Sequence, residues 1–178
     1  MTPQKDYNMC MDKVYEHLLE RGMNPHLYGV SWDDHEACIP LRDLSGKCTG
    51  YLRYRPWGDK KGKDPLTCKY KPTVPKSTMA VFGVETLAYP GNLYVVEGAF
   101  KACKLHNLGF AALAVQGSDP SSVRNQVFLL RQYRNVVCIG DNDKAGRVFT
   151  NGLGGFTSPR DLDEMTDEEV KELLNGNH

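Results

Sequence analysis

Short apolar runs alternate with amphipathic segments through the second half of the chain. The apolar runs predict strands. The segments between the runs have apolar residues three and four positions apart, a spacing that predicts helices. In chain order these elements are expected at residues 93–97, 99–109, 110–115, 120–134 and 135–140. Pro120 and Ser121 open the second helical segment, and Thr166 followed by Glu169 has the capping-box spacing that begins a short terminal helix. Strand and helix alternating at this spacing predict an α/β fold, a parallel sheet flanked by helices.

The first half of the chain has a different pattern. Residues 6–24 have helical spacing, with Gly22 as a stop signal. Residues 36–58 alternate as strands do, and the "DLSG" turn at residues 43–46 predicts a hairpin. A polar loop follows, and the prolines of "KYKPTVPK" argue against regular structure until about Met79. We therefore expect a small α+β subdomain before the parallel sheet.

Charge is distributed unevenly along the chain, although the formal net charge is zero. Residues 42–76 contain ten basic and three acidic residues, whereas residues 141–172 contain nine acidic and four basic ones. This asymmetry suggests one surface for a polyanion and another for cations, with two ordinary solvated faces as the alternative. We accordingly expect a basic N-terminal subdomain over residues 1–90 and the parallel-sheet domain over residues 91–178.

Several protein classes do not fit the sequence. No apolar run approaches the roughly 18 residues that a membrane span requires, and the N-terminal residues lack the apolar core of a secretory signal. We therefore expect a cytoplasmic protein without a membrane segment. The six cysteines are scattered and form no C-x-x-C pair, so no zinc site is expected, and Cys103 and Cys138 are interpreted as small buried hydrophobes.

Acidic residues stand directly after two of the predicted strands. Glu97 follows "LYVV", and Asp141 and Asp143 follow "VVCIG". In a parallel sheet these positions meet at one edge, where ligands bind. Two unit charges about 4 Å apart repel by about 4 kcal/mol at an effective dielectric of 20, so a cation is expected among them. Carboxylate ligands alone favour Mg²⁺ or Mn²⁺ over zinc; for Asp143 by itself, the alternative is a helix N-cap.

The motifs around these acids resemble a known domain. "VVEGAFKACKLHNLGFAALAVQGSDPS" and "NVVCIGDNDKAGR" resemble the two motifs of the Toprim domain, which bacterial-type primases, topoisomerases and several nucleases share. Glu97 stands in the place of the motif glutamate, and Asp141 with Asp143 forms the DxD pair. "IPLRDLSGKCTGYLRYRP" and "KYKPTVPKSTMAVFGVETL" resemble the basic subdomain that precedes Toprim in the catalytic cores of bacterial and phage primases. The resemblance extends over residues 25–175.

The chain departs from that family in two places. Toprim primases often have an aspartate three residues after the glutamate, where this chain has Phe100 followed by Lys101. The family also has a later lysine and acidic motif, and "PRDLDEM" offers Asp161 and Asp163 as further metal ligands, with Arg160 in the place of the lysine.

The resemblance implies metal-dependent nucleotidyl transfer, the synthesis of RNA primers on single-stranded DNA during replication. Metal ligands would be Glu97, Asp141 and Asp143. The resemblance and the local chemistry also nominate residues that bind nucleotide or template, namely Arg53, Arg55, Lys69, Tyr70, Lys101 and Lys144. Tyr51, Tyr54 and Trp57 are further candidates to stack on bases, with packing of a small sheet as the alternative.

Two other functions remain open at this stage: a Toprim nuclease, and a non-catalytic protein that binds nucleic acid or a replication partner. The sequence contains no zinc module and no G-x-x-x-x-G-K-[ST] motif of a helicase. A primase of this kind would therefore take single-stranded DNA and nucleoside triphosphates as partners and use a separately encoded zinc module or helicase. Its compact form suggests a phage or mobile-element origin.

Overall fold

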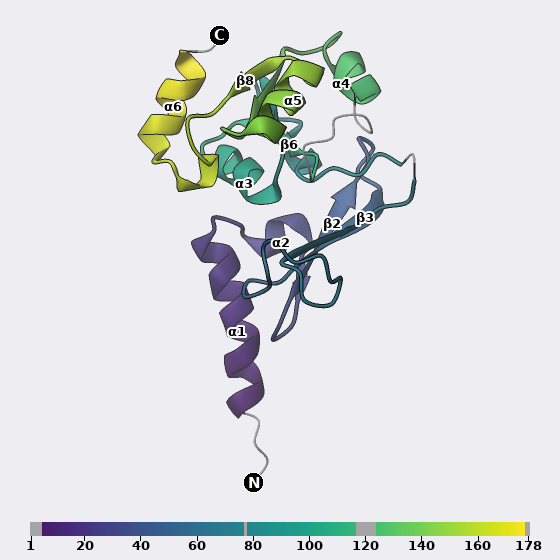
Figure 1. The fold of residues 1–178 in the computed structure, drawn as a ribbon, viewed down its shortest axis with the longest axis vertical. Helices are drawn as coiled ribbons and strands as arrows, with labels where there is room; N and C mark the ends of the chain where they lie inside the picture. The colour runs from purple at the N-terminus through teal and green to yellow at the C-terminus, as the bar shows by residue number, and fades with distance from the viewer. Residues whose placement is uncertain (1–4, 77, 117–123, 177–178) are drawn as a thin grey trace. The chain divides into compact units, whose positions relative to one another are not determined.

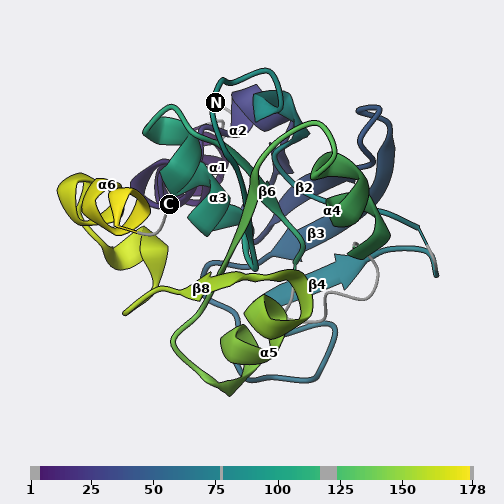
Figure 2. The same cartoon turned by 90° about the horizontal axis from the view of Figure 1, so that it is seen from above.

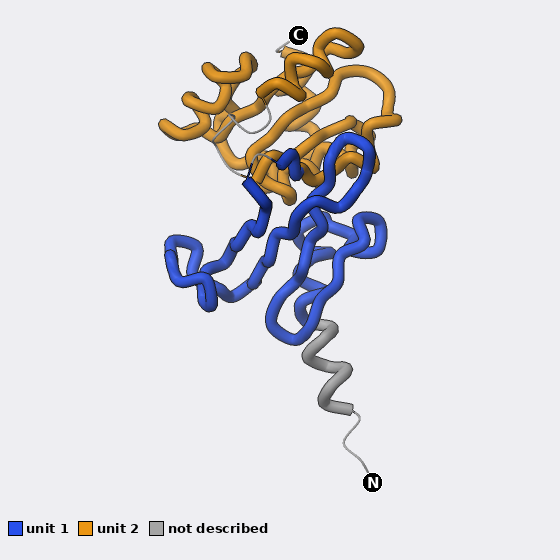
Figure 3. The backbone as a smooth tube through the Cα atoms, turned by 90° about the vertical axis from the view of Figure 1, so that its right-hand side faces the viewer, with its two compact units in different colours: residues 1–80 blue, residues 81–178 orange. Residues whose placement is uncertain are grey.

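The computed structural model describes residues 5–76, 78–116 and 124–176 and, within residues 5–12, the backbone alone. It divides into two compact units, Met1–Ala80 and Val81–His178 (Figure 3). The sequence-based division between residues 90 and 91 stays a prediction.

The first unit combines two helices with an antiparallel sheet (Figure 1). The helices are α1 (Lys5–Glu20) and α2 (Pro25–Tyr28). The sheet has the order β1-β2-β3-β4, with β1 at Ser31–Trp32, β2 at Ala37–Arg42, β3 at Cys48–Tyr54 and β4 at Tyr70–Thr73. The predicted small α+β arrangement is confirmed.

The hairpin between β2 and β3 forms where the turn chemistry predicts it. Asp43 Oδ1 accepts hydrogen bonds from the backbone N–H of Ser45 at 2.9 Å and of Lys47 at 3.1 Å. Gly46 has φ of 86°, a left-handed conformation that glycine adopts without steric cost. The aspartate and the glycine of this turn therefore set the register of the two strands.

The expectation of irregular structure before Met79 is wrong for Tyr70–Thr73, which form β4. Pro72 lies within this strand, opposite Leu52 of β3. A proline has no N–H to donate, and a strand at the edge of a sheet tolerates it because only one side of the strand is paired. β4 is such an edge strand.

The second unit contains a four-stranded parallel sheet of order β6-β5-β7-β8. Its strands are β5 (Leu93–Val96), β6 (Ala111–Ala114), β7 (Val136–Gly140) and β8 (Gly155–Thr157). The helices are α3 (Ala99–Asn107), α4 (Arg124–Leu130), α5 (Lys144–Leu153) and α6 (Asp167–Asn175), with short 3-10 turns η1 (Val84–Thr86) and η2 (Leu162–Glu164). In Figure 1, α3 lies on one side of the sheet and α4 and α5 on the other, as right-handed crossovers require.

Three of the four parallel strands were predicted, and β8 was missed. Its sequence, Gly-Phe-Thr, is too short and too weakly apolar to produce a strand pattern. Backbone pairing with β7 makes it a strand, and Gly155 has φ of 147° with no room for a side chain next to Cys138. The expected start of the helix before β7, at Pro120 and Ser121, lies outside the described residues; the described helix, α4, begins at Arg124.

The core of the second unit is formed by strands that are buried along their whole length. All four residues of β5 and all four of β6 are buried, as parallel strands covered on both faces require. Cys103 and Cys138 are buried in this core without disulfides, and burial raises the pKa of the Cys138 thiol to about 11. The interpretation of both cysteines as small hydrophobes is confirmed.

Helix α6 packs next to α3 (Figures 1 and 2), and Lys104 Nζ of α3 donates to Asp167 Oδ1 at 2.6 Å. The predicted capping box is present: Thr166 Oγ1 accepts from the backbone N–H of Glu169, whose carboxylate accepts from that of Thr166. Among the described residues, no helix is long and apolar enough to cross a membrane.

Replacing Thr166 with alanine removes one half of this capping box. We expect the free energy of unfolding to fall by about 1 kcal/mol, since an N-cap hydroxyl satisfies a backbone N–H that is otherwise unpaired. Urea denaturation followed by circular dichroism measures the change. Glu168→Gln removes a charge from the same turn and leaves the box intact, so an equal loss in both variants would contradict this origin.

Candidate active site

Two acidic residues lie side by side at the C-terminal ends of neighbouring strands of the parallel sheet. Strands β5 and β7 are direct neighbours, with Val96 opposite Ile139, so the residues after the two strands emerge together. Glu97 Oε1 accepts a hydrogen bond from the backbone N–H of Asp141 at 3.1 Å. The structure thus brings together acids that are separated by more than forty residues in the chain.

Asp143 has a different position from the one expected. Asp141 and Asp143 were expected to point the same way, as alternate residues of an extended strand do. The extended conformation does not reach Asp143, because β7 ends at Gly140 and the Asp143 N–H donates to the Asp141 carbonyl at 2.8 Å. The Asp143 carboxylate accepts from the backbone N–H of Gly146 at 2.7 Å and caps α5. Asp143 is therefore the N-cap of α5, and its exposed carboxylate also lies near enough to Glu97 to act on it electrostatically.

Two glycines allow α5 to begin against the end of β7. A Cβ on Gly140 would overlap the backbone of Gly146, and a Cβ on Gly146 would overlap the backbone of Asp141. Neither position has a left-handed φ, so the requirement is for space rather than for backbone freedom. This close approach holds Asp141 and the first turn of α5 in a fixed relation.

Lys101 enters the acidic cluster from the first turn of α3. Its ammonium forms an ion pair and hydrogen bond with Asp141 Oδ1 and lies 3.7 Å from Asp161 Oδ1. Only 13% of the Lys101 side chain is exposed. Asp161 precedes η2 and Asp163 lies within it. Both aspartates were candidate metal ligands from the sequence, and both interact electrostatically with the Lys101 ammonium.

Burial and charge shift the pKa values of both interior groups. Burial raises the pKa of Glu97, and the negative charges of Asp141 and Asp143 act in the same direction, against the Asp141 N–H and the Lys101 ammonium. For Lys101, burial acts to lower the pKa, but Asp141, Asp161 and Asp163 outweigh it and raise the pKa above its ordinary value. Lys101 is therefore a permanent cation inside the cluster.

Other residues predicted to contact nucleic acid lie on the first unit, where Glu36 forms ion pairs with two of them. Glu36 pairs with Arg53 at 3.5 Å and with Arg55 at 2.7 Å. Arg55 also donates to the carbonyls of Pro65 and Cys68 at 3.0 and 3.2 Å. Arg55 thus anchors the loop before β4, while the Arg53 side chain remains 54% exposed. Nothing in the sequence pattern singled out Glu36.

Lys69 and Tyr70 belong to an aromatic cluster of the same unit. Tyr54 is fully buried, so it is a packing residue and not a stacking surface. It contacts the Tyr70 ring at 5.2 Å between centroids and receives a hydrogen bond from Arg21, while Lys69 Nζ lies 5.9 Å from its ring centre. Tyr51 is 47% exposed, Tyr70 37% and Trp57 64%, so these three rings present accessible aromatic surface on the first unit.

Comparison with known proteins agrees with this geometry. The family model described as Toprim-like matches residues 94–164, which include Glu97 and the two aspartates after β7. This part of the chain is therefore similar to the Toprim-like family. No curated protein matches the sequence.

Solved structures of primase catalytic cores share the fold. The DnaG catalytic core matches with a TM-score of 0.60 and 22% identity over 91% of this chain and 59% of its own. The Aquifex aeolicus primase, solved with its zinc-binding and RNA polymerase domains, matches with a TM-score of 0.64 and 18% identity over 100% and 62%. A DnaG primase catalytic domain bound to single-stranded DNA matches with a TM-score of 0.56 and 22% identity over 90% and 56%.

The present chain therefore spans about three fifths of the length of these structures. At this level of identity the likeness establishes the fold, which is that of a primase catalytic core, with the Toprim-like domain in the second unit.

The ligand types of the Toprim-like domain fit a hard divalent ion, because Glu97 and Asp141 offer carboxylate oxygens at the end of adjacent strands. Their present arrangement is not that of a complete ligand set. Within the described ranges, no group of three or more His, Cys, Asp or Glu side chains is placed to hold a metal ion. The ammonium of Lys101 already neutralises part of the cluster.

The remaining predicted cation of this domain is Lys144, the first residue of α5, whose side chain is exposed. Lys101, by contrast, is bound to carboxylates and would have to leave them to reach a phosphate. The two lysines thus differ in that Lys144 is exposed to solvent and Lys101 is paired with carboxylates.

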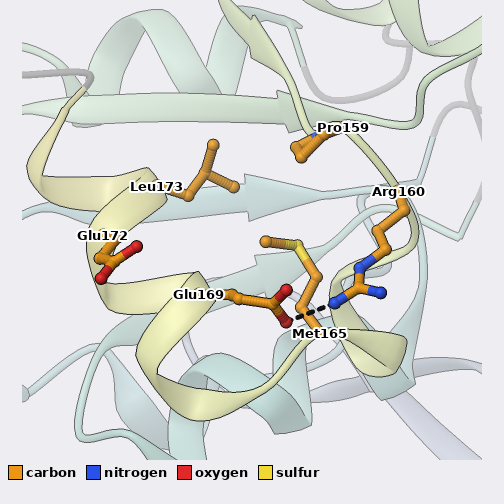
Figure 4. Close-up of a pocket in the computed structure, with 6 residues that line it drawn as sticks. All are labelled: Pro159, Arg160, Met165, Glu169, Glu172 and Leu173. Atoms are coloured by element: carbon orange, nitrogen blue, oxygen red, sulfur yellow. Dashed lines mark hydrogen bonds and ion pairs between the residues drawn. The ribbon is translucent and has the colours of Figure 1, made fainter.

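A pocket on the second unit lies between the segment before η2 and helix α6 (Figure 4). Met165 and Leu173 give it apolar walls, and Arg160 pairs with Glu169 at its edge. Arg160, in the place of the family's lysine, is therefore bound to the carboxylate that completes the capping box of α6. Glu97, Asp141 and Asp143 do not line this pocket.

Proposed function

We propose that this chain is the catalytic core of a primase-type nucleotidyltransferase that makes RNA primers on single-stranded DNA with a divalent ion, Mg²⁺ or Mn²⁺. The observation that carries the proposal is the contact between Glu97 and Asp141 at the ends of adjacent parallel strands, within a primase-like fold. Glu97, Asp141 and Asp143 would bind the ion, with Asp161 and Asp163 contributing negative charge from the later motif.

In the proposed reaction, a 3′-hydroxyl attacks the α-phosphate of an incoming nucleoside triphosphate; a P–O bond forms, the hydroxyl loses its proton and pyrophosphate leaves. A bound divalent ion would supply positive charge to stabilise the phosphate oxygens during transfer. Glu97 and Asp141 would provide the negative charges that place this reaction at the C-terminal ends of β5 and β7. The closely packed β7–α5 junction keeps Asp141 in place.

The first unit would bind template through charge and stacking. Burial lowers the pKa of Lys69, and the positive charges of Arg21 and Lys60 act in the same direction, in keeping with a group of basic side chains around it. Such a group of cations attracts a phosphate backbone, and the exposed rings of Trp57 and Tyr70 offer surfaces on which bases stack. Arg53 is the exposed arginine of this unit that we assign to phosphate contact.

A primer-synthesis assay tests the proposed function. The purified chain is incubated with labelled nucleotides, single-stranded DNA and Mg²⁺ or Mn²⁺, and the products are separated on a gel. Metal-dependent oligoribonucleotides support the proposal. Shortened template would favour a Toprim nuclease, and binding without any product would favour a non-catalytic partner. The assay is repeated with a primase zinc module and a replicative helicase added, to test whether either stimulates synthesis.

Lys69→Ala is expected to weaken binding to single-stranded DNA. Loss of one phosphate contact lowers the slope of log affinity against log salt concentration by about 0.7. Fluorescence anisotropy at several salt concentrations measures this slope. Lys171→Ala, which removes an exposed lysine of α6 in the other unit, is the matched control. An unchanged slope for Lys69→Ala, or an equal change in the control, would exclude Lys69 from the template contact.

A further inference from the structure

The position of Lys101 is electrostatically unusual. Helix α3 begins at Ala99, so Lys101 lies in its first turn, where the helix dipole disfavours a positive charge. The side chain is also 13% exposed, which costs the ammonium most of its hydration. A lysine in this place needs strong compensation from neighbouring anions.

That compensation comes from the acidic cluster itself. The ammonium is bound to Asp141 Oδ1 and lies 3.7 Å from Asp161 Oδ1, and Asp163 adds a further negative charge. These aspartates come from two separate segments, the end of β7 and the segment around η2. One cation therefore joins segments that would otherwise repel one another.

We propose that the Lys101 ammonium is a built-in counter-ion that occupies the place beside Asp141 where a divalent ion would bind, so that such an ion must displace it. This inference rests on the metal-dependent function proposed above. An ammonium and a divalent cation on the same carboxylate oxygen repel strongly, because the partly buried setting screens charge less than water does. The flexible four-carbon stem of lysine allows the ammonium to move away.

Two consequences distinguish this arrangement from a site that is merely vacant. The fold does not depend on metal, since the aspartates are already neutralised in its absence. Metal binding is also weaker than the carboxylates alone would give, because each ion that binds Asp141 must first break the lysine pair. Removing the ammonium should reverse both properties.

The experiment compares Mn²⁺ binding to the full chain and to two variants by isothermal titration calorimetry. Lys101→Met removes the charge and keeps the length of the side chain, and we expect it to bind Mn²⁺ at least tenfold more tightly than the unaltered chain. Lys104→Met, on the same helix and paired with Asp167 outside the cluster, should leave the affinity unchanged. Equal affinity for all three proteins would overturn the inference and leave the metal site standing. Absence of Mn²⁺ binding by all three would instead overturn the proposed metal site.

A second measurement uses the unaltered chain and decides the matter if Lys101→Met fails to fold. Acetylation by an amine-reactive reagent is followed residue by residue with mass spectrometry. Without metal, Lys101 should react at least tenfold more slowly than Lys144, which is exposed. At saturating Mn²⁺ its rate should rise severalfold while that of Lys104 stays constant. A Lys101 rate that does not change with bound Mn²⁺ would show that the ion does not displace it.

Discussion

Asp141→Asn is expected to lower the rate of primer synthesis by about 100- to 1,000-fold, the usual effect of removing one charge-stabilising group from an active site. The substitution keeps the shape of the side chain and the backbone contact to Glu97 but removes the charge that pairs with Lys101 and that we propose as a ligand of the divalent ion. Extension of a labelled primer at saturating nucleotide and metal measures the rate. Thermal denaturation followed by circular dichroism verifies that the variant is folded.

Asp167→Asn is the matched control for this experiment. Asp167 also pairs with a lysine of α3, Lys104, but it does so at the surface, at the start of α6. Its replacement should change the rate by less than about twofold, since this exposed ion pair lies outside the acidic cluster and such pairs contribute little to stability. An Asp141→Asn variant that synthesises primers at the normal rate would remove Asp141 from the catalytic residues.

Gly146→Ala is expected to cause the largest loss of stability among conservative single substitutions at the site. A Cβ at this position would lie closer than 3.0 Å to the nitrogen, carbonyl carbon and oxygen of Asp141, all of them backbone atoms that cannot turn away as a side chain does. Overpacking of this kind costs about 1–3 kcal/mol, and we expect the upper end here. Urea denaturation gives the free energy of unfolding.

Gly98→Ala controls for the general effect of adding a methyl group beside the acids. Gly98 precedes α3, has φ of −135°, and a Cβ there would meet nothing within 4 Å. Its loss of stability should stay below about 1 kcal/mol, the usual size of an N-cap effect. Equal losses at positions 98 and 146 would contradict the close packing of α5 against β7 as the cause. Activity should fall with stability in Gly146→Ala, because the same contact positions Asp141.

Local patterns in the sequence predicted most of the second unit because its elements depend on local chemistry. Four-residue apolar runs produced β5 and β6, and the Thr166–Glu169 spacing produced the cap of α6. β8 and β4 escaped prediction for the opposite reason. A three-residue edge strand and a strand with Pro72 exist only through pairing with a neighbour, which leaves little trace in their own residues.

The candidate site shows the same division more sharply. Glu97 and Asp141 were expected to meet, because the ends of adjacent parallel strands coincide whatever the intervening sequence. The N-cap of α5 was an open alternative for Asp143. Strand β7 ends at Gly140, and the close packing of Gly140 against Gly146 leaves room for α5 to begin directly after the strand, with Asp143 as its cap.

The sequence alone shows that this protein is an α/β chain with an unequal charge distribution and with acidic residues at the ends of two parallel strands. These features could be predicted because the spacing of hydrophobic residues and the position of a strand end are local properties of the chain. Only the tertiary structure decided that Lys101 lies among those acids, that Glu36 engages Arg53 and Arg55, and that Tyr54 is buried. Those facts depend on side chains from distant segments meeting in space. Electrostatic energy depends on the distance between charges and on their burial, and neither quantity can be obtained from the order of the residues.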